Sequence, residues 1–185
     1  MDDIVKQAMA KWPNVPDCYG WLGLDARGNW YMRDDAAQAA GAFASGLPGA
    51  RGSLLQHAKL IEFIQRNYAC NDQGEWFFQN GPQRVYVELQ ATPWIWRVDA
   101  AAGITSHAGG AATYQAALMD EHGWLYLQTS VGFGLVHTQD VAHAALAIEA
   151  GHWSVQDVVL LELPQCFGYV TSPQKSRLVS ASRNT

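Results

Sequence analysis

A short turn phrase occurs three times in this sequence and constrains its fold more than any other feature. Each copy opens with Asp or Asn, has Gly three residues later and has Trp one or two residues after that, at 25–30, 71–76 and 120–124. Asp and Asn hydrogen-bond to the backbone of such a turn, and Gly adopts the positive φ that closes it. Apolar or aromatic segments of strand length flank every copy. The phrase therefore predicts three β-hairpins.

Helix and strand patterns fill the segments around these turns. The sequence predicts a short amphipathic helix over residues 2–11, a longer one from Ser53, which opens a capping-box pattern, and a third over 138–150. Residues 84–91 alternate between apolar and polar side chains, as in a half-buried antiparallel strand. Gly and Pro follow one another closely within 34–52, and we expect a mobile loop there after a short helical turn.

The order of these elements predicts an α+β fold of two related halves, each a small antiparallel sheet of hairpins packed on one helix. Both halves contain a strand pattern followed by proline, Val87-Glu88-Leu89 before Pro93 and Leu161-Glu162-Leu163 before Pro164, which indicates a degenerate internal duplication. The predicted segments are a first repeat with an N-terminal helix at 1–99, an Ala- and Gly-rich connector at 100–112, a second repeat at 113–171 and a flexible tail at 172–185.

Charge and hydropathy exclude several classes of protein. The 185-residue chain has a net charge of −5, and its 12 Lys and Arg residues are scattered. Binding to nucleic acid or to a membrane surface requires clustered positive charge, so we expect neither partner. No apolar stretch approaches the roughly 18 residues of a membrane-spanning helix, and no basic leader with an apolar run opens the sequence.

The cysteines indicate a reducing environment. Cys18, Cys70 and Cys166 are far apart, odd in number and outside any Cys-x-x-Cys motif. Isolated thiols of this kind are usually small buried residues in a reducing compartment. We therefore expect a cytoplasmic location.

Two stretches resemble an uncharacterised family of proteobacterial proteins, a domain of unknown function. They are Cys18-Tyr19-Gly20-Trp21-Leu22-Gly23-Leu24-Asp25 through Gly28-Asn29-Trp30-Tyr31-Met32-Arg33-Asp34, and Phe77-Phe78-Gln79-Asn80-Gly81-Pro82-Gln83-Arg84-Val85-Tyr86-Val87-Glu88-Leu89. The similarity is best over residues 16–98. The resemblance implies a tandem α+β repeat and suggests a role in signalling. Because the family supplies no known catalytic residues, it assigns none here.

No catalytic or metal-binding motif stands out in the sequence. His137 and His143 are six residues apart, and His143 and His152 are nine apart, whereas two ligands on one helix face are three or four apart. The sequence also lacks a Gly-x-Ser-x-Gly nucleophile motif. We therefore predict no catalytic residue, no metal site and no cofactor. A hydrolase whose dispersed histidines and cysteines meet in the fold is an alternative.

One set of side chains is suited to binding a ligand. Arg84, Tyr86 and Glu88 share one face of a strand, and Trp94 and Trp96 share a face of the next. If both faces line a groove between the halves, they offer a cation, a carboxylate, a phenol and two indoles, which suits a polar organic ligand or a peptide. The alternative is that Arg84 and Glu88 are exposed cross-strand partners and that the indoles belong to the core.

These observations together predict a non-catalytic module that binds a small molecule or a peptide and has a regulatory role. A self-associating interaction protein is a further alternative, because an open strand edge can pair with another copy. A homodimer would follow from that alternative.

Overall fold

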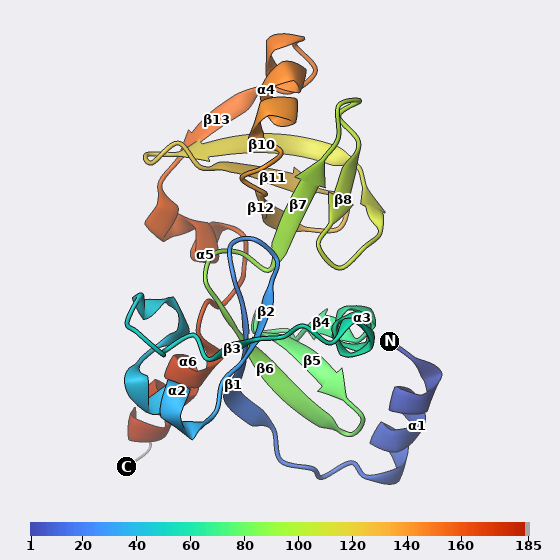
Figure 1. The fold of residues 1–185 in the computed structure, drawn as a ribbon, viewed down its shortest axis with the longest axis vertical. Coiled ribbons are helices and arrows are strands. Elements are labelled where there is room, and N and C mark those ends of the chain that lie inside the picture. The colour runs from blue at the N-terminus through green and yellow to red at the C-terminus, as the bar shows by residue number, and fades with distance from the viewer. Residues whose placement is uncertain (184–185) are drawn as a thin grey trace. The chain divides into compact units, whose positions relative to one another are not determined.

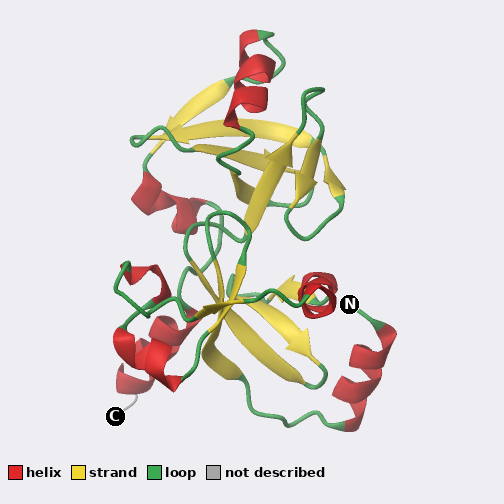
Figure 2. Cartoon of the chain, in the orientation of Figure 1, coloured by secondary structure: helices red, strands yellow, loops and turns green. Residues whose placement is uncertain are grey.

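The computed structural model describes residues 1–183 and divides the chain into two compact units (Figure 1). Unit 1 consists of residues 1–25, residues 29–90 and the segment from Tyr169 onward, and unit 2 consists of residues 26–28 and 91–168. Each unit contains one β-sheet with its own helices (Figure 2). Within residues 1–183, no helix combines the length and the apolar character that crossing a bilayer requires.

Unit 1 is built on a six-stranded sheet with the order β3-β2-β1-β6-β5-β4. Its neighbouring strands are antiparallel except for the central pair, β1 and β6, which is parallel. The elements are α1 (Asp3–Lys11), β1 (Cys18–Leu24), β2 (Trp30–Met32), α2 (Asp35–Ala40), the 3-10 turn η1 (Phe43–Ser45), β3 (Ser53–Leu54), α3 (Ala58–Arg66), β4 (Tyr68–Cys70), β5 (Trp76–Asn80), β6 (Gln83–Leu89) and α6 (Pro173–Arg183).

Unit 2 is built on a seven-stranded sheet with the order β13-β10-β11-β12-β7-β8-β9. Its parallel pairs are β12 with β7 and β10 with β13. The elements are β7 (Trp94–Val98), β8 (Ile104–Ser106), β9 (Ala111–Ala112), β10 (Tyr114–Asp120), β11 (Leu125–Thr129), β12 (Phe133–Val136), α4 (Val141–Glu149), β13 (Val155–Val158), the 3-10 turn η2 (Leu160–Glu162) and α5 (Leu163–Cys166).

The two sheets share one strand order. Taken from its other edge, the second sheet has the order β9-β8-β7-β12-β11-β10-β13. This is the order of the first sheet with β7 to β12 in place of β1 to β6, and with β13 added at the edge. The parallel pair of β1 and β6 then matches that of β7 and β12. The predicted α+β fold of two related halves is confirmed. The parallel pair at the centre of each sheet was not predicted from the sequence.

All three repeated turns form the predicted hairpins. They join β1 to β2, β4 to β5 and β10 to β11, and each pair is antiparallel. In the second and third turns, Oδ1 of Asn71 or Asp120 accepts hydrogen bonds from the backbone N–H groups two and four residues on, at 2.9–3.1 Å. Gly74 and Gly123 both have a φ of 78°, as the turn chemistry requires.

A fourth turn of the same geometry joins β7 to β8, where the sequence has no such phrase. Asp99 Oδ1 accepts hydrogen bonds from the N–H groups of Ala101 and Gly103 at 2.9 and 2.8 Å. Ala102, with a φ of 59°, occupies the position that Gly holds in the other turns. Because this turn makes a hairpin, residues 104–112 carry β8 and β9 instead of the predicted connector. The main segment of unit 2 begins at residue 91, before the end of the predicted first repeat at 99.

The predicted second repeat ends differently in the structure. Residues 160–166 form η2 and α5, with Pro164 near the start of α5, a position where proline fits a helix. The segment therefore does not match the strand at 87–89. In the shared strand order the counterpart of β6 is β12. The predicted flexible tail carries α6 over Pro173–Arg183, and residues 184–185 lie outside the described part of the chain.

Arg33 organises the segment that the sequence predicts as a mobile loop. Its side chain is 1% exposed and donates hydrogen bonds to the carbonyl oxygens of Gly20, Ala37, Gly41 and Ala50. Four acceptors satisfy the buried guanidinium without a carboxylate. The segment between β2 and β3 consequently contains α2 and η1.

Helix α3 begins five residues later than the capping-box pattern predicts. Ser53 lies in β3 and pairs with Met32, and the helix starts at Ala58. His57 is its N-cap, with Nδ1 accepting from the backbone N–H of Leu60 at 3.3 Å. The imidazole of His57 therefore satisfies a helix end.

Candidate functional site

Arg84, Tyr86 and Glu88 lie on β6 in unit 1 at alternate positions, as predicted, but their surroundings differ. The strand is not half-buried, because residues 86–89 are all buried. This burial follows from the position of β6 between β1 and β5, at the centre of the sheet. The three side chains therefore meet three separate environments.

Glu88 anchors the C-terminal helix. It is 2% exposed, and it accepts hydrogen bonds from Ser172 Oγ at 2.5 Å and from the backbone N–H of Gln174 at 3.0 Å, at the start of α6. Burial raises the pKa of the Glu88 carboxyl, and these two hydrogen bonds oppose the rise. Glu88 is thus neither solvent-exposed nor free for a ligand.

Tyr86 is covered by an aromatic stack. Its ring centroid lies 4.4 Å from that of Tyr19, and the two rings are nearly parallel. The guanidinium of Arg177, a residue of α6, lies 4.5 Å from the centroid of the Tyr19 ring. Burial is the main cause that raises the pKa of Tyr19 to about 12. Tyr86 is only 3% exposed.

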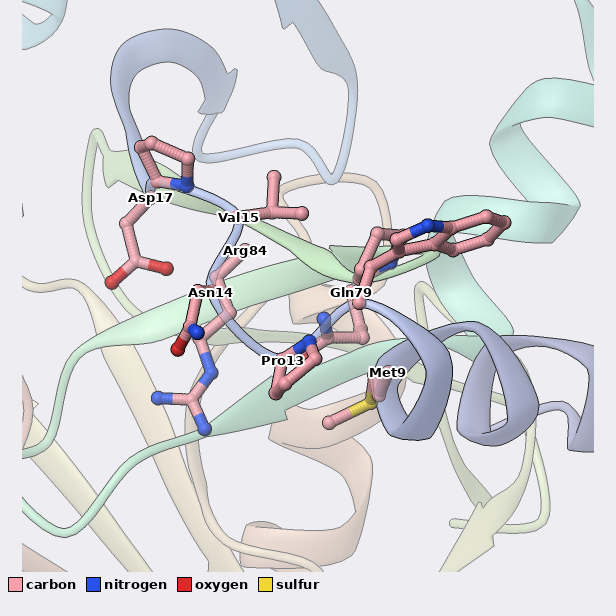
Figure 3. Close-up of a pocket in the computed structure, with 10 residues that line it drawn as sticks. Met9, Pro13, Asn14, Val15, Asp17, Gln79 and Arg84 are labelled. Atoms are coloured by element: carbon pink, nitrogen blue, oxygen red, sulfur yellow. The ribbon is translucent and has the colours of Figure 1, made fainter.

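Arg84 reaches a cavity of about 590 Å³ within unit 1 (Figure 3). We call residues 12–17, which join α1 to β1, the arm. The space between the arm, the end of α1 and the β5–β6 hairpin is called the arm cavity. Its lining includes Met9, Trp12, Asn14, Asp17, Gln79 and Arg84. The Arg84 guanidinium lies 4.8 Å from the Phe77 ring centroid. Stacking on a ring uses the face of a guanidinium and leaves its N–H edges for an acceptor.

Contacts of α1 and of Pro16 hold the arm in place. At the start of α1, the backbone N–H of Asp2 donates to Asn67 Oδ1 at 2.8 Å, and Asn67 Nδ2 donates back to the Asp2 carboxylate at 3.3 Å. At the other end, Gln83 Nε2 donates to the carbonyl oxygen of Pro16 at 3.0 Å. Val5 is 2% exposed and fixes the inner face of α1.

Gln79 on β5 is the unusual member of this site. It lines the arm cavity and is 1% exposed. Its Nε2 donates to the Gly81 carbonyl at 2.9 Å, which fixes the orientation of the amide, and its Oε1 makes no hydrogen bond. A buried acceptor without a donor costs about 1–3 kcal/mol. Gln79 is paired with Arg84 in the β5–β6 register, so both side chains project from one face of the hairpin.

Trp94 and Trp96 lie on β7, in unit 2. Trp96 is fully buried, and its Nε1 donates to the Leu127 carbonyl at 3.1 Å. Trp94 packs against the same hydrophobic core, with its ring 5.9 Å from that of Trp96. The two indoles therefore pack in the core of unit 2. The sequence allowed this arrangement as the alternative to a ligand-binding face.

Cys18 and Cys70 are poorly suited to nucleophilic catalysis. Burial raises the pKa of the Cys18 and Cys70 thiols, which lowers the thiolate fraction that a nucleophile requires. All three cysteines are unpaired. Across residues 1–183, no group of three or more His, Cys, Asp or Glu side chains could hold a metal ion.

Sequence reasoning identified Arg84 and missed the residues that complete its site. Gln79, Trp12 and Asp17 are separated along the chain and belong to no motif. The available signal was the Trp-Pro-Asn-Val-Pro stretch at 12–16, which ends a helix and forces an extended segment. Which strands that segment crosses depends on tertiary contacts such as Gln83 with Pro16.

A family model supports the predicted resemblance, and two solved structures show similarity to the chain. Residues 1–174 match the model of a family described as "Protein of unknown function (DUF2946)", a longer stretch than the predicted 16–98. A DUF1285 family protein from Shewanella baltica OS155 is similar in structure, with 15% identity over 68% of this chain and 91% of that chain and a TM-score of 0.46. Another from Silicibacter pomeroyi DSS-3 has 11% identity over 78% and 83% and a TM-score of 0.47. No curated protein matches the chain.

Proposed function

This chain belongs to that family of unknown function, and we propose that it is a non-catalytic module that binds a small polar molecule in the arm cavity. Arg84 is the proposed anchor for an anionic group of that molecule. The observation that carries the proposal is the buried Gln79 side chain, which lines the cavity together with Arg84 and whose Oε1 makes no hydrogen bond. A bound molecule that donates to Gln79 would remove the cost of that unpaired acceptor.

The size and lining of the cavity support this use. Its volume of about 590 Å³ falls within the usual range of roughly 300–1,000 Å³ for small-molecule sites. Its lining combines apolar side chains such as Met9 and Val15 with polar groups that can fix the orientation of a ligand. Among residues 1–183, Arg84 forms no ion pair, so its charge is available to a ligand.

We also propose that the module has a regulatory or signalling role. The arm connects the cavity to α1, so a ligand that contacts Trp12 or Asp17 would stabilise the arm and α1 together. The three unpaired cysteines support the expected cytoplasmic location.

A thermal-shift screen with small carboxylates, amino acids, nucleotides and short peptides tests the proposal. The wild type is compared with Arg84→Gln and with Lys59→Gln, which removes the same charge from an exposed position on α3. We expect at least one class of compound to raise the melting temperature of the wild type and of Lys59→Gln, and to lose its effect on Arg84→Gln. The proposal is wrong if every stabilising compound acts equally on all three proteins.

A further inference from the structure

We infer that the ligand of the arm cavity is a zwitterion of the α-amino acid class, with an apolar side chain. This inference rests on the proposed function and specifies its ligand. It follows from the chemical complement of the groups that line the cavity, taken one at a time.

The charged groups of the cavity require both signs in the ligand. Arg84 carries only N–H donors and needs an acceptor, for which a carboxylate is the best geometric match. Asp17 and Gln79 Oε1 are acceptors, and neither forms an ion pair or accepts a hydrogen bond from another described side chain. Donors on an ammonium group would satisfy them. A purely anionic ligand would leave Gln79 Oε1 without a donor and would place its charge near the Asp17 carboxylate.

The apolar residues that line the cavity determine the third group of the ligand, its side chain. Met9, Val15 and the indole of Trp12, which is 51% exposed, form an apolar surface beside the polar groups. Prolines at 13, 16 and 82 extend that surface. An aliphatic or aromatic side chain would cover it, because burial of apolar area stabilises the complex. Carboxylate, ammonium and apolar side chain together describe a simple amino acid.

Isothermal titration calorimetry with four related probes tests the inference. L-phenylalanine carries all three groups, N-acetyl-L-phenylalanine lacks the ammonium, L-phenylalaninamide lacks the carboxylate, and 3-phenylpropionate keeps only the carboxylate and the ring. We expect L-phenylalanine to bind the wild type most tightly. Each of the other three should bind at least about tenfold more weakly, because one charge-assisted contact is lost.

Two variants separate the two ends of the ligand. Asp17→Asn is an exposed, near-isosteric change, and it should weaken L-phenylalanine and L-phenylalaninamide while leaving N-acetyl-L-phenylalanine unchanged. Arg84→Gln should weaken L-phenylalanine and the N-acetyl compound and leave the amide unchanged. Lys59→Gln should bind all four probes as the wild type does. A melting curve of each variant establishes that it is folded.

The outcomes distinguish the ligand class from the function. If N-acetyl-L-phenylalanine or 3-phenylpropionate binds as tightly as L-phenylalanine and depends on Arg84, the ligand is a simple anion or a peptide C-terminus. The inference of a zwitterionic ligand is then wrong, and the proposed binding function is retained. If L-phenylalanine does not bind, the zwitterion is also wrong. If in addition no compound of the thermal-shift screen depends on Arg84, the proposed function fails with it.

Discussion

Ala102 occupies in its turn the backbone position that Gly123 occupies in the turn after β10. Both residues lie three positions after an aspartate whose Oδ1 accepts from the N–H groups two and four residues on. Their φ values are 59° and 78°. Glycine adopts this conformation without a steric penalty, whereas alanine places its Cβ close to the carbonyl oxygen. Unit 2 therefore stores strain at Ala102.

The strain at Ala102 predicts a stabilising substitution. Ala102→Gly should raise the free energy of unfolding by about 0.5–1 kcal/mol, because relief of the left-handed strain outweighs the added entropy of the unfolded chain. Gly123→Ala is the matched control. A Cβ added there meets open space. The expected loss of about 1 kcal/mol in the free energy of unfolding therefore comes only from the strained backbone conformation. Urea unfolding followed by tryptophan fluorescence measures both, and a destabilised Ala102→Gly protein would contradict the account.

Arg33 should be essential for the order of the segment between β2 and β3. Arg33→Met removes four hydrogen bonds to buried or partly buried carbonyl groups, and we expect a loss of about 2–4 kcal/mol in the free energy of unfolding. Limited proteolysis should then cut within residues 34–52. Arg66→Met, at a side chain that is 54% exposed, is the control and should cost less than about 1 kcal/mol. Equal effects of the two changes would refute this role of Arg33.

Asp140 should contribute stability that depends on pH. Its carboxylate accepts hydrogen bonds from Nε and Nη2 of Arg97 and from the Val98 N–H, and the hydrogen bond from Arg97 is the main cause that lowers its pKa below the usual 3.8. A lowered folded-state pKa gives stability that is present above the unfolded pKa and is lost as the pH falls through the folded value.

The variant Asp140→Asn measures this contribution. At pH 7 we expect the wild type to be more stable by about 1–2 kcal/mol, a modest figure because the Arg97 side chain is 49% exposed. The difference should narrow as the pH falls below about 4, where the carboxylate is protonated. Denaturant titrations at several pH values give the difference directly. A gap that widens in acid would overturn the assignment.

Glu88 should show the opposite dependence on pH. Burial raises the pKa of its carboxyl above 4.5, so the stabilising protonated form is fully present below pH 4.5 and is lost as the pH rises through the folded value. Glu88→Gln mimics the protonated form. The wild type should therefore lose stability relative to Glu88→Gln between pH 4.5 and 7, by about 1.4 kcal/mol for each unit of the rise in pKa. A constant difference, measured by the same titrations, would show that the carboxyl is not desolvated.

Local chemistry made much of this fold predictable from the sequence. The hairpins at 25–30, 71–76 and 120–124 follow from turn residues whose conformational preferences are nearly independent of context. The hairpin at Asp99 could not be found in this way, because Ala102 stands where the preference demands glycine. The central pairing of β1 with β6 joins residues more than 60 positions apart, and no local preference encodes it.

The candidate site was predictable only in part, for the same reason. Alternation along β6 identified Arg84 as a polar residue on one face of the strand. The burial of Gln79 depends on the arm that crosses the hairpin, and the arm is held by contacts such as that between Asp2 and Asn67, 65 residues apart. Side chains that meet through such distant contacts leave no spacing pattern in the sequence.

The side-chain amide resonances of Gln79 give the most direct test of the binding account. L-phenylalanine is titrated into ¹⁵N-labelled protein, and the Gln79 Nε2 signals are assigned by their disappearance in Gln79→Met. We expect a saturable shift of these signals in the wild type, because a donor reaches the vacant Oε1, and no such shift in Arg84→Gln. If L-phenylalanine binds while the Gln79 signals stay unmoved and other residues shift, the arm cavity is not the binding site.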